Sequence, residues 1–215
     1  MFRLYSPRRT EKIIRALDPE IHFLQDRYRL PAACVQAILY QEMTHMDALD
    51  LLADGAVRLF WLKYRACKRL GKQGFPGGLN KKRDSSTGYA QIFSAVGIRA
   101  VEFAVEKGIE SREALGLPGR ALRADTPEDL QLIWHRLRKD PVFNLRLCAL
   151  NLLFCAQQMT GRTDFSSFGE NEMRLIFTRY NANASAVTAY GRETYAHFLR
   201  YSGQRAAPSF SAPSI

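Results

Sequence analysis

The sequence contains little cysteine, and the cysteines it has are not arranged as in a metal site or a disulfide framework. No C-x-x-C pair occurs, and the four cysteines lie inside apolar helical patterns, at Cys34, Cys67, Cys148 and Cys155. Zinc sites and disulfide-stabilised folds usually show closely spaced cysteines, whereas isolated cysteines in apolar stretches behave as small core residues. We therefore expect reduced, buried thiols, no metal site and no cofactor.

Long hydrophobic runs are also missing. The longest uncharged stretch, residues 147–161, is too short and too rich in Asn and Gln to span a bilayer. Residues 1–9 lack the apolar core of a secretory signal. We expect a protein made in the cytoplasm, without a transmembrane segment. To act outside the cytoplasm it would need release or delivery, as by a phage or a specialised secretion system.

Acidic residues are outnumbered by basic ones. The chain has 31 Lys and Arg against 21 Asp and Glu, a formal net charge of +10. Such an excess suits a polyanionic partner, which includes nucleic acid, an anionic membrane surface and the bacterial wall. The basic residues are scattered along predicted helices, without a long basic arm or a zinc-finger pattern. We therefore expect no sequence-specific recognition of nucleic acid.

What is present is helical periodicity, which predicts a mostly α fold. Hydrophobic residues make up 47% of the 215, enough for one substantial core. We expect one domain over residues 1–204, with N-terminal helices over 8–29, a core over 30–202 and a disordered tail over 205–215. The glycine-rich region around residues 72–92 is predicted as a loop or a short strand and turn. Residues 108–139 are interpreted as an insertion, either a lid or a partner-binding helix.

Helix boundaries follow from start and stop signals. The helices after the N-terminal pair are predicted from residue 31 to 46, 47 to 70, 93 to 108, 126 to 139, 171 to 181 and 185 to 201. Thr126 and Asp140, each followed by proline, are predicted N-caps. The helix that starts after Asp140 is apolar almost all round, so we expect it in the centre of the domain.

One carboxylate falls on an apolar helix face. The helix predicted after Pro31 has a continuous hydrophobic stripe, made of Val35, Ile38, Leu39 and Met46. Glu42 continues this stripe, seven residues after its first member. Burial raises a carboxyl pKa, and a carboxyl that stays protonated near neutral pH can act as general acid in glycosidic cleavage. The alternative is a structural Glu42, partly exposed or paired with an arginine.

His45 gives this helix a Glu-x-x-His pattern, which is half of a di-iron motif. That site requires a second such pair, and no other Glu in the chain has His three residues later. We therefore predict no metal at Glu42.

Three segments, in order, resemble the soluble lytic transglycosylase and goose-type lysozyme families. The first ends in Gln41-Glu42, similar to the family's apolar helix that carries its catalytic Glu. The second, Gly88-Tyr89-Ala90-Gln91-Ile92, is similar to the family's Gly-Leu-Met-Gln-Ile/Val segment. The third, Tyr180-Asn181-Ala182, resembles its Tyr-Asn-Ala/Ala-Gly motif, and Glu193-Thr194-Tyr195 resembles the family's closing Glu-Thr and tyrosine.

The resemblance implies a lysozyme-like fold and the roles of particular residues. Glu42 would protonate the oxygen between N-acetylmuramic acid and N-acetylglucosamine in peptidoglycan glycan strands. The implied substrate-binding residues are Gly88, Tyr89, Gln91, Tyr180, Asn181 and Tyr195. The sequence departs from the pattern at Met43, where the family usually has serine, and at Tyr89-Ala90 in place of Leu-Met.

A hydrolase of this kind uses a second carboxylate, and the sequence identifies that residue less clearly than it identifies Glu42. Family transglycosylases use one Glu, because the muramic sugar's own hydroxyl attacks, whereas goose-type lysozymes carry aspartates near the glycine motif. Asp84, four residues before Gly88, is the candidate, and its alternative is a turn residue that caps Ser85-Ser86. Hydrolysis and anhydro-forming transfer both stay open.

Other functions also stay open. A monomeric peptidoglycan-cleaving glycosidase is favoured. A non-catalytic glycan-binding relative and a chitin- or chitosan-cleaving β-1,4-glycanase are the nearest alternatives. A basic helical adaptor for nucleic acid or membrane would leave the Glu42, Gln91 and Tyr180 series unexplained.

Overall fold

The structure is a computed structural model that describes residues 3–71 and 84–203, and this part of the chain is mostly helical. The prediction of a mostly α fold is confirmed. The described helices are α1 (Pro7–Ala16), α2 (Asp18–Tyr28), α3 (Ala32–His45), α4 (Ala48–Arg69), α5 (Ser94–Glu106), α6 (Pro127–Lys139), α7 (Pro141–Thr160), the 3-10 helix η1 (Phe165–Ser167), α8 (Glu170–Asn181) and α9 (Ala189–Tyr201).

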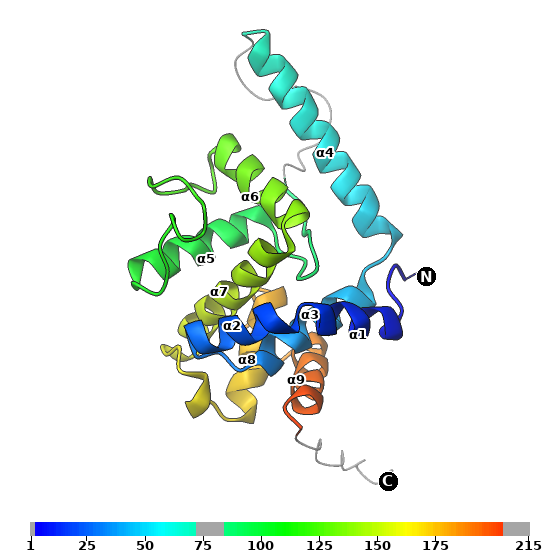
Figure 1. Cartoon of the computed structure of the whole chain (residues 1–215), viewed down its shortest axis with the longest axis vertical. Coiled ribbons are helices and arrows are strands. Elements are labelled where there is room, and N and C mark those ends of the chain that lie inside the picture. The colour runs from blue at the N-terminus through cyan, green and yellow to red at the C-terminus, as the bar shows by residue number, and fades with distance from the viewer. Residues whose placement is uncertain (1–2, 72–83, 204–215) are drawn as a thin grey trace.

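The central helix is α7, as its apolar sequence predicts (Figure 1). It packs against α5 and α8 on different sides, and also contacts α6 and α2. Its side chains Leu145, Leu147 and Leu150 are fully buried. Asp140 caps the first turn by accepting a hydrogen bond from the Phe143 backbone N–H at 3.0 Å, so this predicted N-cap is confirmed.

One predicted helix start and one predicted side-chain cap differ from the structure. The last helix begins at Ala189 rather than at residue 185, because the Thr188 side chain accepts from the Gly191 backbone N–H and caps it there. Thr126 precedes α6 as predicted, but its side chain makes no capping hydrogen bond. Instead, Pro127 occupies the first turn, where its missing N–H has no intrahelical partner to lose.

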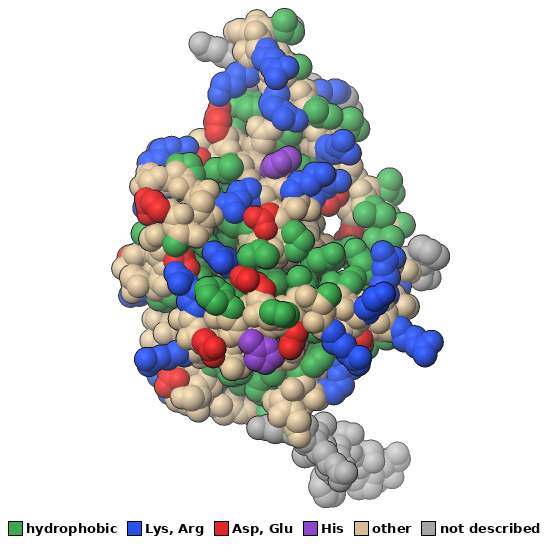
Figure 2. All heavy atoms as spheres, in the orientation of Figure 1, with side chains coloured by type: hydrophobic (Ala, Val, Ile, Leu, Met, Phe, Trp, Pro, Cys, Tyr) green, Lys and Arg blue, Asp and Glu red, His purple; other side chains and the backbone are tan. Residues whose placement is uncertain are grey.

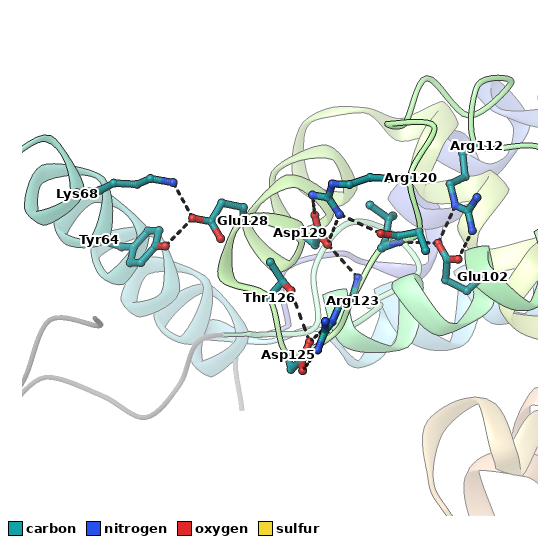
Figure 3. Close-up of polar contacts among 12 residues, drawn as sticks. Tyr64, Lys68, Glu102, Arg112, Arg120, Arg123, Asp125, Thr126, Glu128 and Asp129 are labelled. Carbon is teal, nitrogen blue, oxygen red and sulfur yellow. Dashed lines mark hydrogen bonds and ion pairs between the residues drawn. The ribbon is translucent and has the colours of Figure 1, made fainter. Parts of the chain in front are cut away.

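The irregular chain between α5 and α6 is tied down by charged side chains (Figure 3). Buried Asp129 accepts from both terminal nitrogens of Arg120 and from the Arg123 backbone N–H. Glu102 accepts from Arg112 and from the backbone of Leu122. Helix α6 packs against both α5 and α7. The segment predicted as an insertion is therefore built into the helical body.

Helix α4 projects away from the other helices (Figure 1). Its inner face buries Val57, Phe60 and Trp61. Near the C-terminal end of α4, Lys68 and Tyr64 donate hydrogen bonds to the α6 side chain Glu128, at 2.7 Å and 2.8 Å (Figure 3). These contacts join α4 to α6.

Several sequence predictions have a direct outcome. All four cysteines are free, and Cys34, Cys148 and Cys155 are buried as expected, whereas Cys67 is partly exposed. Within the described residues, no helix is long and apolar enough to cross a bilayer. The predicted loop falls outside the described residues over 72–83, as does the predicted tail over 205–215.

Candidate active site

Helix α3 holds Glu42 between the core and a pocket. The apolar stripe predicted around it is buried, at Val35, Ile38, Leu39 and Met46. Glu42 itself is partly exposed, because its carboxyl end reaches a pocket of about 330 Å³. We call this the Glu42 pocket; its other lining residues are His45, Met46, Asp47, Asp50, Ser86, Gln91, Phe93, Tyr180 and Asn181.

The surroundings of Glu42 favour its protonated form. Burial raises the pKa of this carboxyl to about 7, against an ordinary value of 4.5. The hydrogen bond donated by the Tyr190 hydroxyl lowers the pKa, because it stabilises the carboxylate, and the negative charge of Asp50 raises it. Burial is the largest of the three effects. A carboxyl with a pKa near 7 can give and take a proton at neutral pH.

Two tyrosines reach the site from α8 and α9. Tyr190 donates to Oε1 of Glu42, and Tyr180 donates to the Ala90 carbonyl at 2.9 Å. These helices approach closely at Gly191, where an added Cβ would lie 2.1 Å from the Thr178 hydroxyl and 2.5 Å from the Arg174 carbonyl. Only glycine fits between the two backbones here, and this close approach brings both tyrosines to the same region.

A tight turn forms the facing wall. Thr87 and Ile92 pair through their backbones, with N–O distances of 3.1 and 3.2 Å, so the predicted strand and turn is a single hairpin-like bridge. Gly88 has φ +75°, and a Cβ there would lie 2.2 Å from the Asn144 amide. Asn144, on α7, accepts from the Ala90 N–H at 2.9 Å and donates to the Thr87 carbonyl at 3.2 Å. The central helix thereby fixes this turn.

Gln91 occupies the corner of the turn. Its φ of +46° is uncommon for a residue with a side chain. The side chain donates to the Gly88 carbonyl at 2.7 Å and accepts from the Ser86 hydroxyl at 3.1 Å. Gln91 is thus held in place while it lines the Glu42 pocket, together with Tyr180 and Asn181 as the sequence predicts.

A second pocket, of about 320 Å³, adjoins the first. The two adjoin along Met46, Asp50, Ser86 and Gln91, which line both, and we call the pair of pockets the groove. The second pocket contains the predicted residues Gly88 and Tyr89, and Tyr5 lies edge-on to Tyr89 with ring centroids 6.4 Å apart. Six of the eight predicted site residues therefore lie along this groove, and the two exceptions are Asp84 and Tyr195.

Asp84 lies outside it. Its Oδ1 accepts from the Ser94 N–H at 2.9 Å and from the Ser94 hydroxyl at 2.7 Å, and its Oδ2 accepts from the Ala95 N–H at 2.9 Å. Both oxygens therefore bind the first turn of α5, which indicates a helix-capping role. The alternative interpretation, a turn residue that caps Ser85-Ser86, is supported in part, because Asp84 also accepts a hydrogen bond from the Ser85 backbone; its other partners belong to α5. Asp50 is the carboxylate that lines both parts of the groove.

The structure does not bring Tyr195 to the groove. Tyr195 is 9% exposed, stacks against Phe198 and has the Arg174 guanidinium over its ring. The tyrosine of α9 that contacts Glu42 is Tyr190, which the sequence analysis missed. Residues five apart on a helix differ by about 140° in direction, so the two tyrosines face different sides. The signal for Tyr190 was its position directly before Gly191, where α9 approaches α8.

Metal ligands do not gather at the site. His45 lies on the rim, and its Nδ1 is 2.8 Å from the Gln41 carbonyl oxygen. Among residues 3–71 and 84–203, no group of three or more His, Cys, Asp or Glu side chains could hold a metal ion. Besides the Glu42 carboxyl, the groove presents the side-chain carboxylates of Asp47, Asp50 and Asp54, and the Tyr180 hydroxyl.

Comparison with known proteins adds no family assignment. No family model, no curated protein and no solved structure matches this chain.

Proposed function

We propose that this protein cleaves the glycan strands of peptidoglycan, with Glu42 as the general acid. The observation that carries the proposal is a carboxyl with a pKa of about 7 in the wall of the groove. Cleavage of a glycosidic bond requires protonation of the leaving oxygen, and a carboxyl poised near neutral pH supplies that proton efficiently.

The groove also offers the contacts that a sugar chain needs. Tyr5 and Tyr89 provide aromatic surface in one part, and Gln91, Tyr180 and Asn181 provide polar groups in the part nearest Glu42. Sugars combine apolar ring faces with hydroxyl and amide groups, so such a mixed lining suits them. The resemblance to lytic transglycosylases and goose-type lysozymes rests on several of these same residues, and it supplies the substrate class in this proposal.

Two routes are compatible with Glu42 as the acid. In the transferase route, Glu42 protonates the leaving oxygen and then accepts the proton of the muramic sugar's hydroxyl as that oxygen closes an anhydro ring. In the hydrolytic route, a second carboxylate positions a water molecule. We propose Asp50 for that role, because it lines both parts of the groove, whereas Asp47 caps α4 and Asp84 caps α5.

The test is digestion of purified peptidoglycan, with mass spectrometry of the released fragments. Parent protein is compared with Glu42→Gln, which keeps the size of the side chain and an acceptor for Tyr190 but cannot transfer a proton. We expect fragment release to fall by at least about 100-fold in the variant. Anhydro-muropeptides would identify the transferase route, and reducing-end muropeptides the hydrolytic one.

Either of two results would contradict the proposal. Folded parent protein that releases no fragments, or a Glu42→Gln variant as active as the parent, would exclude Glu42 as a peptidoglycan-cleaving acid. Binding of intact glycan strands without cleavage would then favour the non-catalytic relative. Release of oligosaccharides from chitin would favour the other glycanase class.

A further inference from the structure

Helix α4 exposes a row of leucines. Leu52 is 68% exposed, Leu59 61% and Leu62 45%. These positions are seven and three residues apart, so they lie along one side of the helix. Exposed Gly55 and Ala66 continue the same side. A contiguous apolar strip of this kind, on a helix that already buries its opposite face, indicates an interaction surface.

The leucine row is bordered by positive charge. From residue 55 to residue 71 the sequence has no Asp or Glu and five basic residues, Arg58, Lys63, Arg65, Lys68 and Arg69. Within the part of the chain that the structure describes, only Lys68 of these five has a carboxylate partner, Glu128. Figure 2 shows Lys and Arg side chains gathered at the end of the molecule where α4 projects, with hydrophobic side chains between them.

A cleft of about 440 Å³ opens beside this row, between α4 and α6. It is lined by basic and aromatic side chains, which are Arg58, Arg65, Trp61, Trp134, His135, Arg138 and Lys139, and also by Leu62 and Glu128. Trp61 is 1% exposed, and its indole N–H has no hydrogen-bond acceptor among the described residues.

We propose that α4 docks the protein on a membrane rich in anionic phospholipid. The row of Leu52, Leu59 and Leu62 enters the interface between headgroups and acyl chains, as in other interfacial helices that combine leucines with a basic face. The cations of the α4–α6 cleft bind the lipid phosphates. This docking does not depend on the chemistry of Glu42.

Two other occupants fit these observations less well. A second copy of the chain would bring the same cations against one another, since Arg58 and Arg65 flank the leucine row and like charges repel. A nucleic acid would satisfy the cations, because its phosphates are anionic. It would nevertheless leave exposed leucines without a function. The membrane accounts for both the charge and the apolar row.

Cosedimentation with lipid vesicles tests the proposal. The full chain is mixed with vesicles of phosphatidylcholine alone and with equimolar phosphatidylcholine and phosphatidylglycerol. We expect binding to the anionic vesicles only, and weaker binding as salt rises. Removal of two cations in Arg58→Gln/Arg65→Gln should weaken binding by about thirtyfold, since each interfacial cation contributes ~1 kcal/mol. Leu52→Ser/Leu59→Ser should weaken binding by about tenfold or more.

Matched controls distinguish docking through α4 from a general effect of the protein's net charge. Arg8→Gln/Lys12→Gln removes two exposed cations from α1, and Phe23→Ser removes an exposed hydrophobic side chain from α2. Circular dichroism and thermal melting must show that each variant is folded. Equal binding to both vesicle types, or none, would overturn the proposal. So would an α1 variant as weak as the α4 arginine variant. Leucine variants that bind like the parent would show a general polyanion site, with DNA as the next ligand to measure.

Discussion

The hydroxyl of Tyr190 donates a hydrogen bond to Oε1 of Glu42, across a separation of 148 positions in the chain. This contact joins α9 to α3, two helices that pack directly against each other. It also opposes the effect of burial, because burial raises the pKa of Glu42 while the donated hydrogen bond lowers it. Tyr190 is therefore a positioning residue that sets both the direction of the carboxyl and the pH at which it releases its proton.

The first prediction concerns this hydrogen bond. Tyr190→Phe removes the donor and keeps the ring, so the pKa of Glu42 should rise above its value of about 7. An acid-catalysed step slows as the acid loses its proton, so the alkaline limb of the rate profile should move to higher pH. The measurement is the rate of peptidoglycan cleavage against pH for parent and variant. A purely structural role for Tyr190 would change the rate at every pH and leave the limb unmoved.

The second prediction concerns Asp50, whose negative charge raises the pKa of Glu42. Asp50→Asn removes the charge and keeps a side-chain acceptor for the Asp47 N–H. The alkaline limb should therefore move to lower pH, opposite to the shift in Tyr190→Phe. Asp84→Asn is the matched control, because that carboxylate binds α5 and lies outside the groove. A limb that moves with Asp84→Asn but not with Asp50→Asn would reverse this assignment.

Local signals in the sequence were sufficient to predict most of the helices. Asp140-Pro141 marks the start of α7 correctly, because an N-cap and a proline in the first turn act within a few residues. The stripe that ends at Met46 likewise predicts the inner face of α3, since a period of 3.6 residues is local information. Glu42 at the edge of that face follows from the same pattern.

The rest of the site depends on contacts that no local pattern encodes. Tyr190 reaches Glu42 because α9 packs against α3, and that packing joins residues far apart in the sequence. Asp84 shows the reverse case. Its closeness in sequence to Gly88 suggested the groove, but its carboxylate binds the N–H groups of α5. Proximity along the chain does not fix the direction of a side chain at a turn.

The third prediction concerns the effect of the Glu42 pKa on the free energy of unfolding. The pKa of Glu42 is about 7 in the folded protein, against an ordinary value of 4.5, so the folded state binds this proton more tightly than the unfolded state. The stabilisation that proton binding gives is complete below pH 4.5 and is lost as pH rises through 7. Glu42→Gln should therefore be more stable than the parent at pH 8, by roughly 1–3 kcal/mol, and equal to it at pH 4. Urea denaturation at both pH values measures the difference. Glu106→Gln, on the exposed surface of α5, should change neither.

The fourth prediction compares two glycines with similar backbones. Gly88 has φ +75° and Gly108 has φ +65°, so alanine at either position adopts an unfavourable left-handed conformation, at a cost of about 1 kcal/mol. Only at Gly88 would the new Cβ also clash, at 2.2 Å from the Asn144 amide and 2.6 Å from the Leu137 carbonyl, whereas nothing lies within 4 Å at Gly108. Gly88→Ala should therefore lower the free energy of unfolding by about 3 kcal/mol or more, and Gly108→Ala by about 1 kcal/mol.

Chemical denaturation of the two alanine variants measures that difference in stability, and the rate of cleavage should differ between them as well. Asn144 holds the turn through Ala90 and Thr87, so its displacement moves the wall that carries Gln91. Cleavage should fall in Gly88→Ala at temperatures where the variant is still folded, and stay near the parent rate in Gly108→Ala. Equal losses of stability in the two variants would mean that backbone strain alone matters, and that Asn144 yields to a methyl group at no cost.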